Sequence, residues 1–353
     1  MTANRATISV VITSYNYADF VGTAIESALK QTRPPDEVVV VDDGSTDRSR
    51  EVIASFGAAV KAVFKQNEGN KVTVNRGYQE SSGSIVLFLD ADDALYPDAL
   101  RRIEEACKPG IVAVQYDLDI IDGGGNLLGR RFCNFGSSTS PDEIAAQFAR
   151  TGTYVWPVTS GNAYDRSFLE RVMPLIPPVS HDGVLNTIAP LYGRVARISE
   201  PLGQYRLHSR NLSTTDGRGG FGRHPDFARA IRIRREEFEI LAEHARKLGN
   251  VLPRGYLLDN ELVFVNYRLM AMRIGQQYPG AADDSAVRLW RRGVALALGG
   301  EYRSKAKLAH VVWLTALLLS PRMVARQLLA LRFGRAELLQ SFRAMLGRAR
   351  RAG

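Results

Sequence analysis

The chain has 353 residues, of which 45% are hydrophobic, and a formal net charge of +9. That length suits one large α/β domain and an appendage, because single hydrophobic cores stop growing at roughly 250 to 300 residues. The basic excess lies at one end: residues 303–353 hold eleven Lys or Arg and one acid, whereas residues 1–302 hold 35 and 36. This distribution argues against a nucleic-acid-binding surface on the main part of the chain.

The two cysteines, Cys107 and Cys133, form neither a metal-binding spacing nor a disulfide framework. Their presence as isolated thiols suits a reducing cytoplasm. The N-terminal residues lead directly into an apolar strand and show no secretory signal pattern. We therefore expect a cytoplasmic protein.

Strand and helix patterns alternate through the first hundred residues. Short apolar runs at Ile8–Ile12, Glu37–Val41, Val60–Phe64 and Ile85–Leu89 are typical of buried strands. The stretches between them carry apolar residues at helical spacing. This alternation predicts an α/β fold with a doubly wound, mostly parallel sheet.

Acidic residues follow two of these strands at their carboxyl ends. Asp42 and Asp43 end the second strand, and Asp90, Asp92 and Asp93 end the fourth. Three carboxylates within four residues repel one another, so their arrangement favours a bound cation. Open α/β sheets bind ligands at this edge, although an acidic turn that caps a helix is the alternative for each group.

Four short motifs occur in order between residues 13 and 93. They are Thr13-Ser14-Tyr15-Asn16, Val41-Asp42-Asp43-Gly44-Ser45-Thr46-Asp47, Asn75-Arg76-Gly77 and Phe88-Leu89-Asp90-Ala91-Asp92-Asp93. Together they resemble the motifs of family 2 glycosyltransferases, which have the GT-A fold. Ser160–Ala163 and Glu200–His208 are similar to later landmarks of that family, so the resemblance covers roughly residues 6–215.

The resemblance implies a binding site for a nucleoside diphosphate sugar. Tyr15 would stack on the base, and Asp42 would bond to its ring nitrogen or to the ribose. Because a carboxylate accepts from the imide N–H of uracil, a UDP-linked donor is expected. The full set of implied donor contacts is Thr13, Tyr15, Asn16, Asp42, Asp43, Lys71, Asn75, Asp90 and Ala91.

One departure from the family pattern concerns the phosphate-facing cation. Relatives often carry an arginine directly before the motif asparagine, whereas Val74 precedes Asn75 in this chain. Lys71 and Arg76 are both candidates to replace that charge, and the sequence does not choose between them.

The resemblance also implies a divalent metal on the diphosphate. Asp90 and Asp92 look like the family's Asp-x-Asp pair, with Asp92 and His208 as metal ligands and Arg206 as a phosphate clamp. Hard oxygen donors suit Mg²⁺ or Mn²⁺. A purely structural histidine is the alternative for His208.

Asp182 is the expected catalytic base for the acceptor hydroxyl. It lies at the start of a predicted helix over 184–191, where relatives carry an acidic pair, although His181 replaces the first acid. A helix N-cap without chemistry is the alternative. Trp156 lies in a loop that either lines an acceptor pocket or packs in the core.

The remainder of the chain divides at a glycine-rich stretch. We expect a glycosyltransferase domain over 1–215, a mobile loop or linker over 216–225, and a helical region over 226–353. The apolar run at 308–319 is shorter than the roughly 20 residues that span a bilayer. Lysines and arginines flank it, which favours association with an anionic membrane surface; a helical hairpin packed on the catalytic domain is the alternative.

These features predict an inverting glycosyltransferase of the hexosyltransferase type. It would move a sugar from a UDP-sugar to a glycan or lipid-linked acceptor in surface polysaccharide synthesis. The chain lacks the Gln-x-x-Arg-Trp motif of processive synthases and the glycine-rich N-terminal signature of sugar nucleotidyltransferases. A nucleotide-binding pseudoenzyme or a scaffold of a polysaccharide assembly complex is the alternative.

Overall fold

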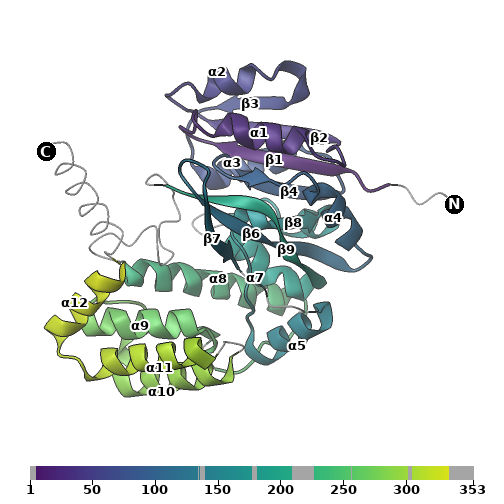
Figure 1. Ribbon diagram of the computed structural model, residues 1–353. Coiled ribbons are helices and arrows are strands. Elements are labelled where there is room, and N and C mark those ends of the chain that lie inside the picture. Colours follow the sequence, from purple (N-terminus) through teal and green to yellow (C-terminus); the bar gives the residue numbers. More distant parts are fainter. Residues whose placement is uncertain are drawn as a thin grey trace, which may run out of the picture. The chain divides into compact units, whose positions relative to one another are not determined.

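The computed structural model describes residues 5–133, 135, 140–176, 181–208, 226–255, 257–300 and 304–333 (Figure 1). The chain divides into two compact units. One contains the residues up to Leu207 together with Glu239–Leu252, and the other contains His208–Phe238 and the residues from Pro253 onward. The predicted linker over 216–225 lies outside the described residues.

A single sheet forms the centre of the first unit. In the described part of the chain its strand order is β3-β2-β1-β4-β8-β6-β9-β5, with β7 paired to β6. The strands are β1 (Ile8–Ser14), β2 (Glu37–Asp43), β3 (Lys61–Lys65), β4 (Ile85–Asp90), β5 (Ala94–Leu95), β6 (Ile111–Asp122), β7 (Leu127–Phe132), β8 (Asn162–Asp165) and β9 (Arg194–Leu207). β1 to β4 pair in parallel, and β6 also pairs in parallel with β9. β8, β7 and β5 pair antiparallel with their neighbours.

Seven helices of the described chain connect these strands. They are α1 (Val21–Leu29), α2 (Ser49–Ala54), α3 (Asn70–Glu80), α4 (Ala99–Ala106), α5 (Pro141–Thr151), α6 (Arg166–Val172) and α7 (His181–Tyr192). The predicted strands and the helix over 184–191 are present, whereas α6, β8 and β9 had no clear pattern in the sequence. The predicted α/β class is confirmed.

Helices cover both faces of the parallel strands, because successive residues of a strand point to opposite faces. On one face Val10 packs with Ile25 of α1 and Leu100 of α4 in a common buried cluster. On the other face α3 lies against β1 at Gly77, where an added Cβ would stand 2.3 Å from the Cγ1 of Val11. This close approach explains why a glycine stands in the Asn-Arg-Gly motif.

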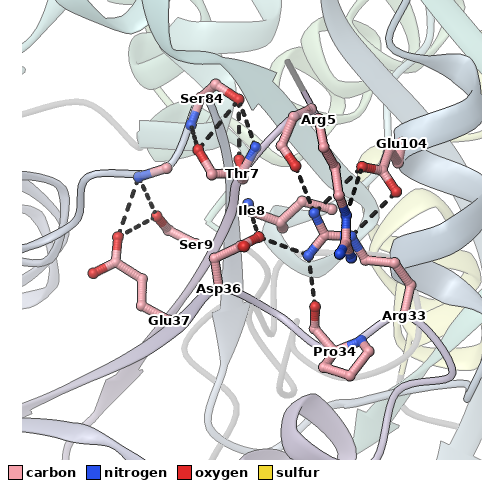
Figure 2. Close-up of polar contacts among 12 residues, drawn as sticks. Arg5, Thr7, Ile8, Ser9, Arg33, Pro34, Asp36, Glu37, Ser84 and Glu104 are labelled. Atoms are coloured by element: carbon pink, nitrogen blue, oxygen red, sulfur yellow. Dashed lines mark hydrogen bonds and ion pairs between the residues drawn. The ribbon is translucent and has the colours of Figure 1, made fainter. Parts of the chain in front are cut away.

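The amino end of the sheet is closed by an ion-pair network around Arg33 (Figure 2). This guanidinium is only 6% exposed. Its Nη1 donates to Asp36 at 2.7 Å, and its Nε donates to Glu104 at 3.1 Å. The carbonyl oxygens of Ala6 and Pro34 accept two further bonds. A planar fork of donors thus ties three segments together at this end.

Glu37 completes the same edge, as Figure 2 shows. Its Oε1 accepts a hydrogen bond from the Ser9 hydroxyl at 2.6 Å. The backbone N–H groups of Ser82 and Gly83 also donate to this oxygen. The acids at the amino end are therefore satisfied by groups of the protein itself.

The second unit is helical, as predicted. Its helices are the first part of α8 (Phe227–Lys247), then α9 (Leu262–Ile274), α10 (Ala286–Gly299), α11 (Ser304–Leu319) and α12 (Arg322–Phe333). At Gly293 of α10 an added Cβ would stand 2.9 Å from Leu314 of α11, so the glycine permits close packing of these helices. Among the described residues, no helix combines the length and apolar composition needed to cross a membrane.

Candidate active site

The strand register brings the predicted acids to one edge of the sheet. Ser14 at the end of β1 pairs with Asp42 of β2, and Thr13 pairs with Asp90 of β4. Because the three strands are parallel, their carboxyl ends meet at the same edge. The two acidic motifs, which are separated in the sequence by two helices, therefore flank the end of β1.

Asp42 presents one unsatisfied oxygen at this edge. The side chain is fully buried, and its Oδ2 accepts a hydrogen bond from the Ser45 N–H at 3.0 Å. Arg50 lies 3.7 Å from the same oxygen. The Oδ1 atom is buried and has no partner among the described residues. A buried carboxylate oxygen without a donor is costly, so this atom is suited to accept from a ligand.

The carboxylate of Asp43, by contrast, is bonded to other groups of the protein. Lys65 forms an ion pair with it, and the N–H groups of Glu68 and Gly69 each donate to its carboxylate at 2.9 Å. These bonds hold the segment between β3 and α3. Asp43 thus fixes the start of the helix that carries Lys71.

Tyr15 and Asn16 form the turn that follows β1. Asn16 has a φ of 58°, in the left-handed region that asparagine tolerates better than most residues. Its side-chain oxygen accepts from the N–H of Thr46 at 2.8 Å, and its own N–H donates to Ser45. The Tyr15 ring next to this turn is 44% exposed. Asn16 therefore joins the turn to the Asp42 motif and leaves an aromatic face open to a ligand.

The acids after β4 lie close to one another and to Asp182. Burial, together with the charges of Asp92 and Asp182, raises the pKa of Asp90 to about 8. A hydrogen bond from Thr159 opposes this rise. Because a neighbouring negative charge acts over only a few ångströms, the effect places Asp182 near the β4 motif. The intervening residue, Ala91, has its methyl group buried in the core.

Asp93 joins the motif to β9. Its Oδ1 accepts from the backbone N–H of Arg206 at 2.9 Å, and the residue is 1% exposed. Arg206 in turn donates from Nε to the Asp92 carbonyl oxygen at 2.8 Å. Weaker bonds of 3.4 Å run from its Nη1 to the carbonyl oxygens of Asp122 and Gly123. This reciprocal pair of contacts, which we call the Arg206 clasp, fixes the backbone at Asp92.

The first turn of α7 carries Asp182 beside a buried histidine. His181 is 3% exposed, and its ring packs edge-on against Phe88 with centroids 5.9 Å apart. Burial lowers the pKa of His181, while the charge of Asp182 raises it and that of Lys71 lowers it. Lys71 therefore lies close to α7. Arg76, the other candidate for the phosphate-facing cation, forms an ion pair with Glu80 at 2.6 Å.

Asn75 anchors the segment that leads to α7. Its side-chain amide donates to the Leu175 carbonyl oxygen, and its side-chain oxygen accepts from the Leu175 N–H, both at 2.9 Å. The side-chain amide of Asn75 thus pairs with the backbone of Leu175 as a neighbouring strand would. Asn75 is thus engaged with the chain itself, and nucleotide binding by this residue stays a prediction.

Two residues that the sequence reasoning did not assign to the site also contact the β4 motif. Ser160 accepts from the Asp90 N–H at 3.1 Å, and Thr159 bonds to the Asp90 carboxyl. Gly161 follows them at a position where an added Cβ would meet Pro157 at 2.5 Å. The Ser-Gly-Asn-Ala landmark was the available signal for this segment, although it did not indicate the contact with Asp90. Trp156, in the preceding loop, is half-buried with its ring 5.4 Å from that of Tyr154.

The chemistry of this edge fits a divalent cation. No group of three or more His, Cys, Asp or Glu side chains converges as a metal site within the described ranges. Of the two predicted metal ligands, Asp92 belongs to the first unit and His208 to the second, so their sharing of one metal stays a prediction. Phosphate oxygens and water would complete the shell around Asp92. The carboxylates that together raise the pKa of Asp90 favour a cation nearby, and hard oxygen donors suit Mg²⁺ or Mn²⁺.

Comparison with known proteins identifies the family. Residues 9–173 match the model of "Glycosyl transferase family 2". This part of the chain belongs to that family. The match includes the strands β1 to β4 and their acidic ends, and it stops before Asp182 and the Arg206 clasp.

Two curated bacterial proteins are among those with a similar sequence. An uncharacterized glycosyltransferase of Nostoc sp. is 38% identical over 213 residues, which cover 58% of this chain. The uncharacterized glycosyltransferase YibD of Escherichia coli is 30% identical over 148 residues, which cover 41% of this chain. The two matches span 66% and 41% of the relatives' own lengths.

Solved structures with a similar backbone include S. aureus TarS 1-349, which was determined in complex with UDP-GlcNAc. That structure has a TM-score of 0.49 and 15% sequence identity, and the match covers 87% of this chain and 89% of TarS 1-349.

Proposed function

We propose that this family 2 glycosyltransferase moves a sugar from a UDP-sugar to a hydroxyl group of a glycan or lipid-linked acceptor, with inversion at the sugar carbon. The observation that carries the proposal is the cluster at the carboxyl edge, where burial and the charges of Asp92 and Asp182 raise the pKa of Asp90. Such a group is unfavourable in the free protein, and a bound cation and ligand would relieve it.

The donor nucleotide would lie across the end of β1. Asp42 Oδ1, which has no donor in the described part of the chain, would accept from the imide N–H of uracil. Tyr15 would stack on the base, since its ring is exposed beside Asp42. Lys71 would face the diphosphate, because the competing Arg76 is paired with Glu80.

Asp182 would be the base that activates the acceptor. The acceptor oxygen would attack the anomeric carbon, and the bond from that carbon to the phosphate oxygen would break with its electron pair leaving on the nucleoside diphosphate. The acceptor proton would pass to the Asp182 carboxylate. The position of Asp182 near Asp90, and so near the donor edge, supports this role.

A divalent cation, when bound, would offset the negative charge of the departing diphosphate. Asp92 and His208 would hold it, and Asp90 would bond to the ribose. Asp43 and Asn75 would support the site indirectly, through their hydrogen bonds to the backbone N–H of Gly69 and the carbonyl oxygen of Leu175. Arg206 would hold the backbone at Asp92 through the clasp rather than contact phosphate directly.

We place this reaction in the cytoplasm, where the free thiols of Cys107 and Cys133 are stable. The acceptor is proposed to belong to surface polysaccharide synthesis, with one sugar transferred per encounter.

The test is a donor hydrolysis assay with UDP-, GDP- and dTDP-sugars in the presence of Mn²⁺, which needs no knowledge of the acceptor. We expect one class of donor, the UDP-sugars, to release nucleoside diphosphate. Asp182→Asn should reduce the release by roughly 10² to 10⁴ fold, the range typical of a lost general base. Asp165→Asn, at the start of α6, is the matched control.

A scaffold without activity would give a different pattern. It would release no nucleoside diphosphate from any donor, and Asp182→Asn would leave its cellular role unchanged. Either result would contradict the proposed transfer.

A further inference from the structure

The outward face of α11 and the start of α12 is apolar. Leu308 is 64% exposed, Val312 is 58% exposed and Leu319 is 75% exposed, and Met323 of α12 is 77% exposed. Leu308 and Val312 are four residues apart, and Val312 and Leu319 are seven apart, so all three lie on one side of α11. We call these four residues the α11–α12 face.

The opposite side of α11 is well packed. Leu314 and Leu317 are buried, at 1% and 0% exposure. Trp313 donates from its indole to Asn266 of α9 at 3.0 Å. Thr315 lies in the same row as Leu308 and Leu319, and it accepts from the Trp290 indole of α10 at 3.0 Å. The exposed part of the row is therefore formed by the residues on either side of Thr315.

This distribution differs from that of an ordinary surface helix, which is apolar inward and charged outward. α11 is apolar on both sides, and Leu308, Val312 and Leu319 are exposed on the side that faces away from Leu314 and Leu317. Scattered exposed leucines are normal, but an aligned row on one face marks an interaction surface.

The charged residues of α11 and α12 are all basic. Neither α11 nor α12 contains an acidic residue. Lys305 lies at the start of α11, and Arg322 and Arg326 lie on α12. Within the described ranges, none of these three cations forms a salt bridge with an acid. Cations beside an apolar row complement a surface that is anionic outside and apolar just beneath it.

We propose that the α11–α12 face binds the surface of an anionic phospholipid bilayer. Leu308, Val312, Leu319 and Met323 enter the boundary between headgroups and acyl chains, and the adjacent lysine and arginines contact lipid phosphates. The helix lies in the plane of the membrane surface, since it is too short to span the bilayer. This inference does not rest on the proposed transfer reaction.

The experiment is co-flotation of the full-length chain with vesicles, in the absence of any nucleotide. Phosphatidylglycerol mixed with phosphatidylcholine provides the anionic surface, and phosphatidylcholine alone is the comparison. We expect binding to the anionic vesicles to be stronger by roughly ten-fold or more, and to fall as the salt concentration rises.

Two variants test the two components of the face. Leu308→Ser with Leu319→Ser removes apolar contacts, and Lys305→Gln with Arg322→Gln removes charge. Each pair should weaken binding by roughly ten-fold, because both contributions are needed. Val287→Ser, at a residue of α10 that is 56% exposed, is the matched control and should bind as the wild type does.

Three results would overturn the proposal. The first is equal binding to neutral and anionic vesicles, and the second is unchanged binding in both double variants. The third is a concentration-dependent dimer in sedimentation that the Leu308→Ser, Leu319→Ser pair abolishes, which would assign the face to a second copy of the chain. Asp182→Asn should bind vesicles normally, so failure here is distinguishable from failure of the transferase assignment.

Discussion

The two edges of the sheet treat their acidic side chains in opposite ways. At the amino edge, Asp36, Glu37 and Glu104 are matched by Arg33 and by backbone N–H groups (Figure 2). At the carboxyl edge, Asp90 lies among other carboxylates that raise its pKa to about 8. Both edges belong to the same unit and to the same strands.

The pKa values express the same contrast. Burial would raise the pKa of Asp36, but hydrogen bonds from the Ile8 N–H and Arg33 lower it overall. Burial and the charges of Asp92 and Asp90 raise the pKa of Asp93. The difference indicates that the amino edge stabilises the fold, whereas the carboxyl edge holds acids whose ionisation is unfavourable until a cation binds nearby.

The largest expected effect comes from comparing one aspartate at each edge. Asp182→Asn should lower turnover by roughly 10² to 10⁴ fold, because the acceptor loses its base. Its melting temperature should not fall, since one of several repelling charges is removed. Asp36→Asn should keep turnover and lose stability, because it breaks the contact with Arg33. Turnover and thermal melting of both variants provide the check, and equal behaviour of the two would erase the distinction between the edges.

Next in size is the loss of Arg33 itself. Arg33→Met should reduce the free energy of unfolding by about 2 kcal/mol, less than for a fully buried pair because Asp36 and Glu104 are partly exposed. Urea unfolding measures this change. Arg48→Met is the control, since its ion pair with Glu51 is exposed and should contribute less than about 0.5 kcal/mol. A similar loss of unfolding free energy in both variants would show that burial does not increase the contribution of the Arg33 ion pairs to stability.

The pH dependence of stability should have opposite signs at the two edges. The pKa of Asp36 is lowered, so its contribution is present above about pH 4 and is lost on acidification. The pKa of Asp90 is raised to about 8, so the folded state holds this proton more tightly and stability falls as pH rises from about 4 to 8.

Urea unfolding of the metal-free protein between pH 5 and 8 tests the second sign. The slope due to Asp90 is at most about 1.4 kcal/mol per pH unit, the value for a single proton. Asp90→Asn should flatten the profile in this range, whereas Asp36→Asn should change it only below about pH 5. An unchanged slope in Asp90→Asn would mean that its carboxyl ionises normally.

The smallest effect is expected from the Arg206 clasp. Arg206→Lys retains the charge but loses the fork that bonds the Asp92, Asp122 and Gly123 carbonyl oxygens. We expect a several-fold weaker affinity for Mn²⁺ with UDP and little change in the affinity for UDP alone, since misplacement by about 1 Å is costly in a preorganised site. An equal loss of both affinities would assign Arg206 to direct phosphate contact instead.

The sequence predicted the part of the site that is built from local patterns. Each apolar run, such as Ile85–Leu89, ends in acids, and parallel pairing then forces the ends of β1, β2 and β4 to one edge. The start of α5 carries a local signal of the same kind, the Ser140 and Glu143 capping box. These features depend on neighbours within a few residues.

The remaining contacts join residues that are distant in the sequence and have no local signature. The Arg206 clasp spans 114 residues, and the Asn75 bonds to Leu175 span 100. β9 escaped notice because Pro201 and several polar residues interrupt its apolar pattern. Which side of α11 is exposed is likewise decided by packing against α9 and α10, because its sequence is apolar on all sides.

The most direct test of the account is a calorimetric titration of UDP into the wild-type protein and Asp92→Ala, each with and without Mn²⁺, and with Asp98→Ala as control. Mn²⁺ should strengthen UDP binding to the wild type and to Asp98→Ala, and this effect should disappear in Asp92→Ala. Binding of UDP that is unaffected by Mn²⁺ and by the loss of Asp92, or no binding by a folded protein, would contradict the assignment of the carboxyl edge as a donor site.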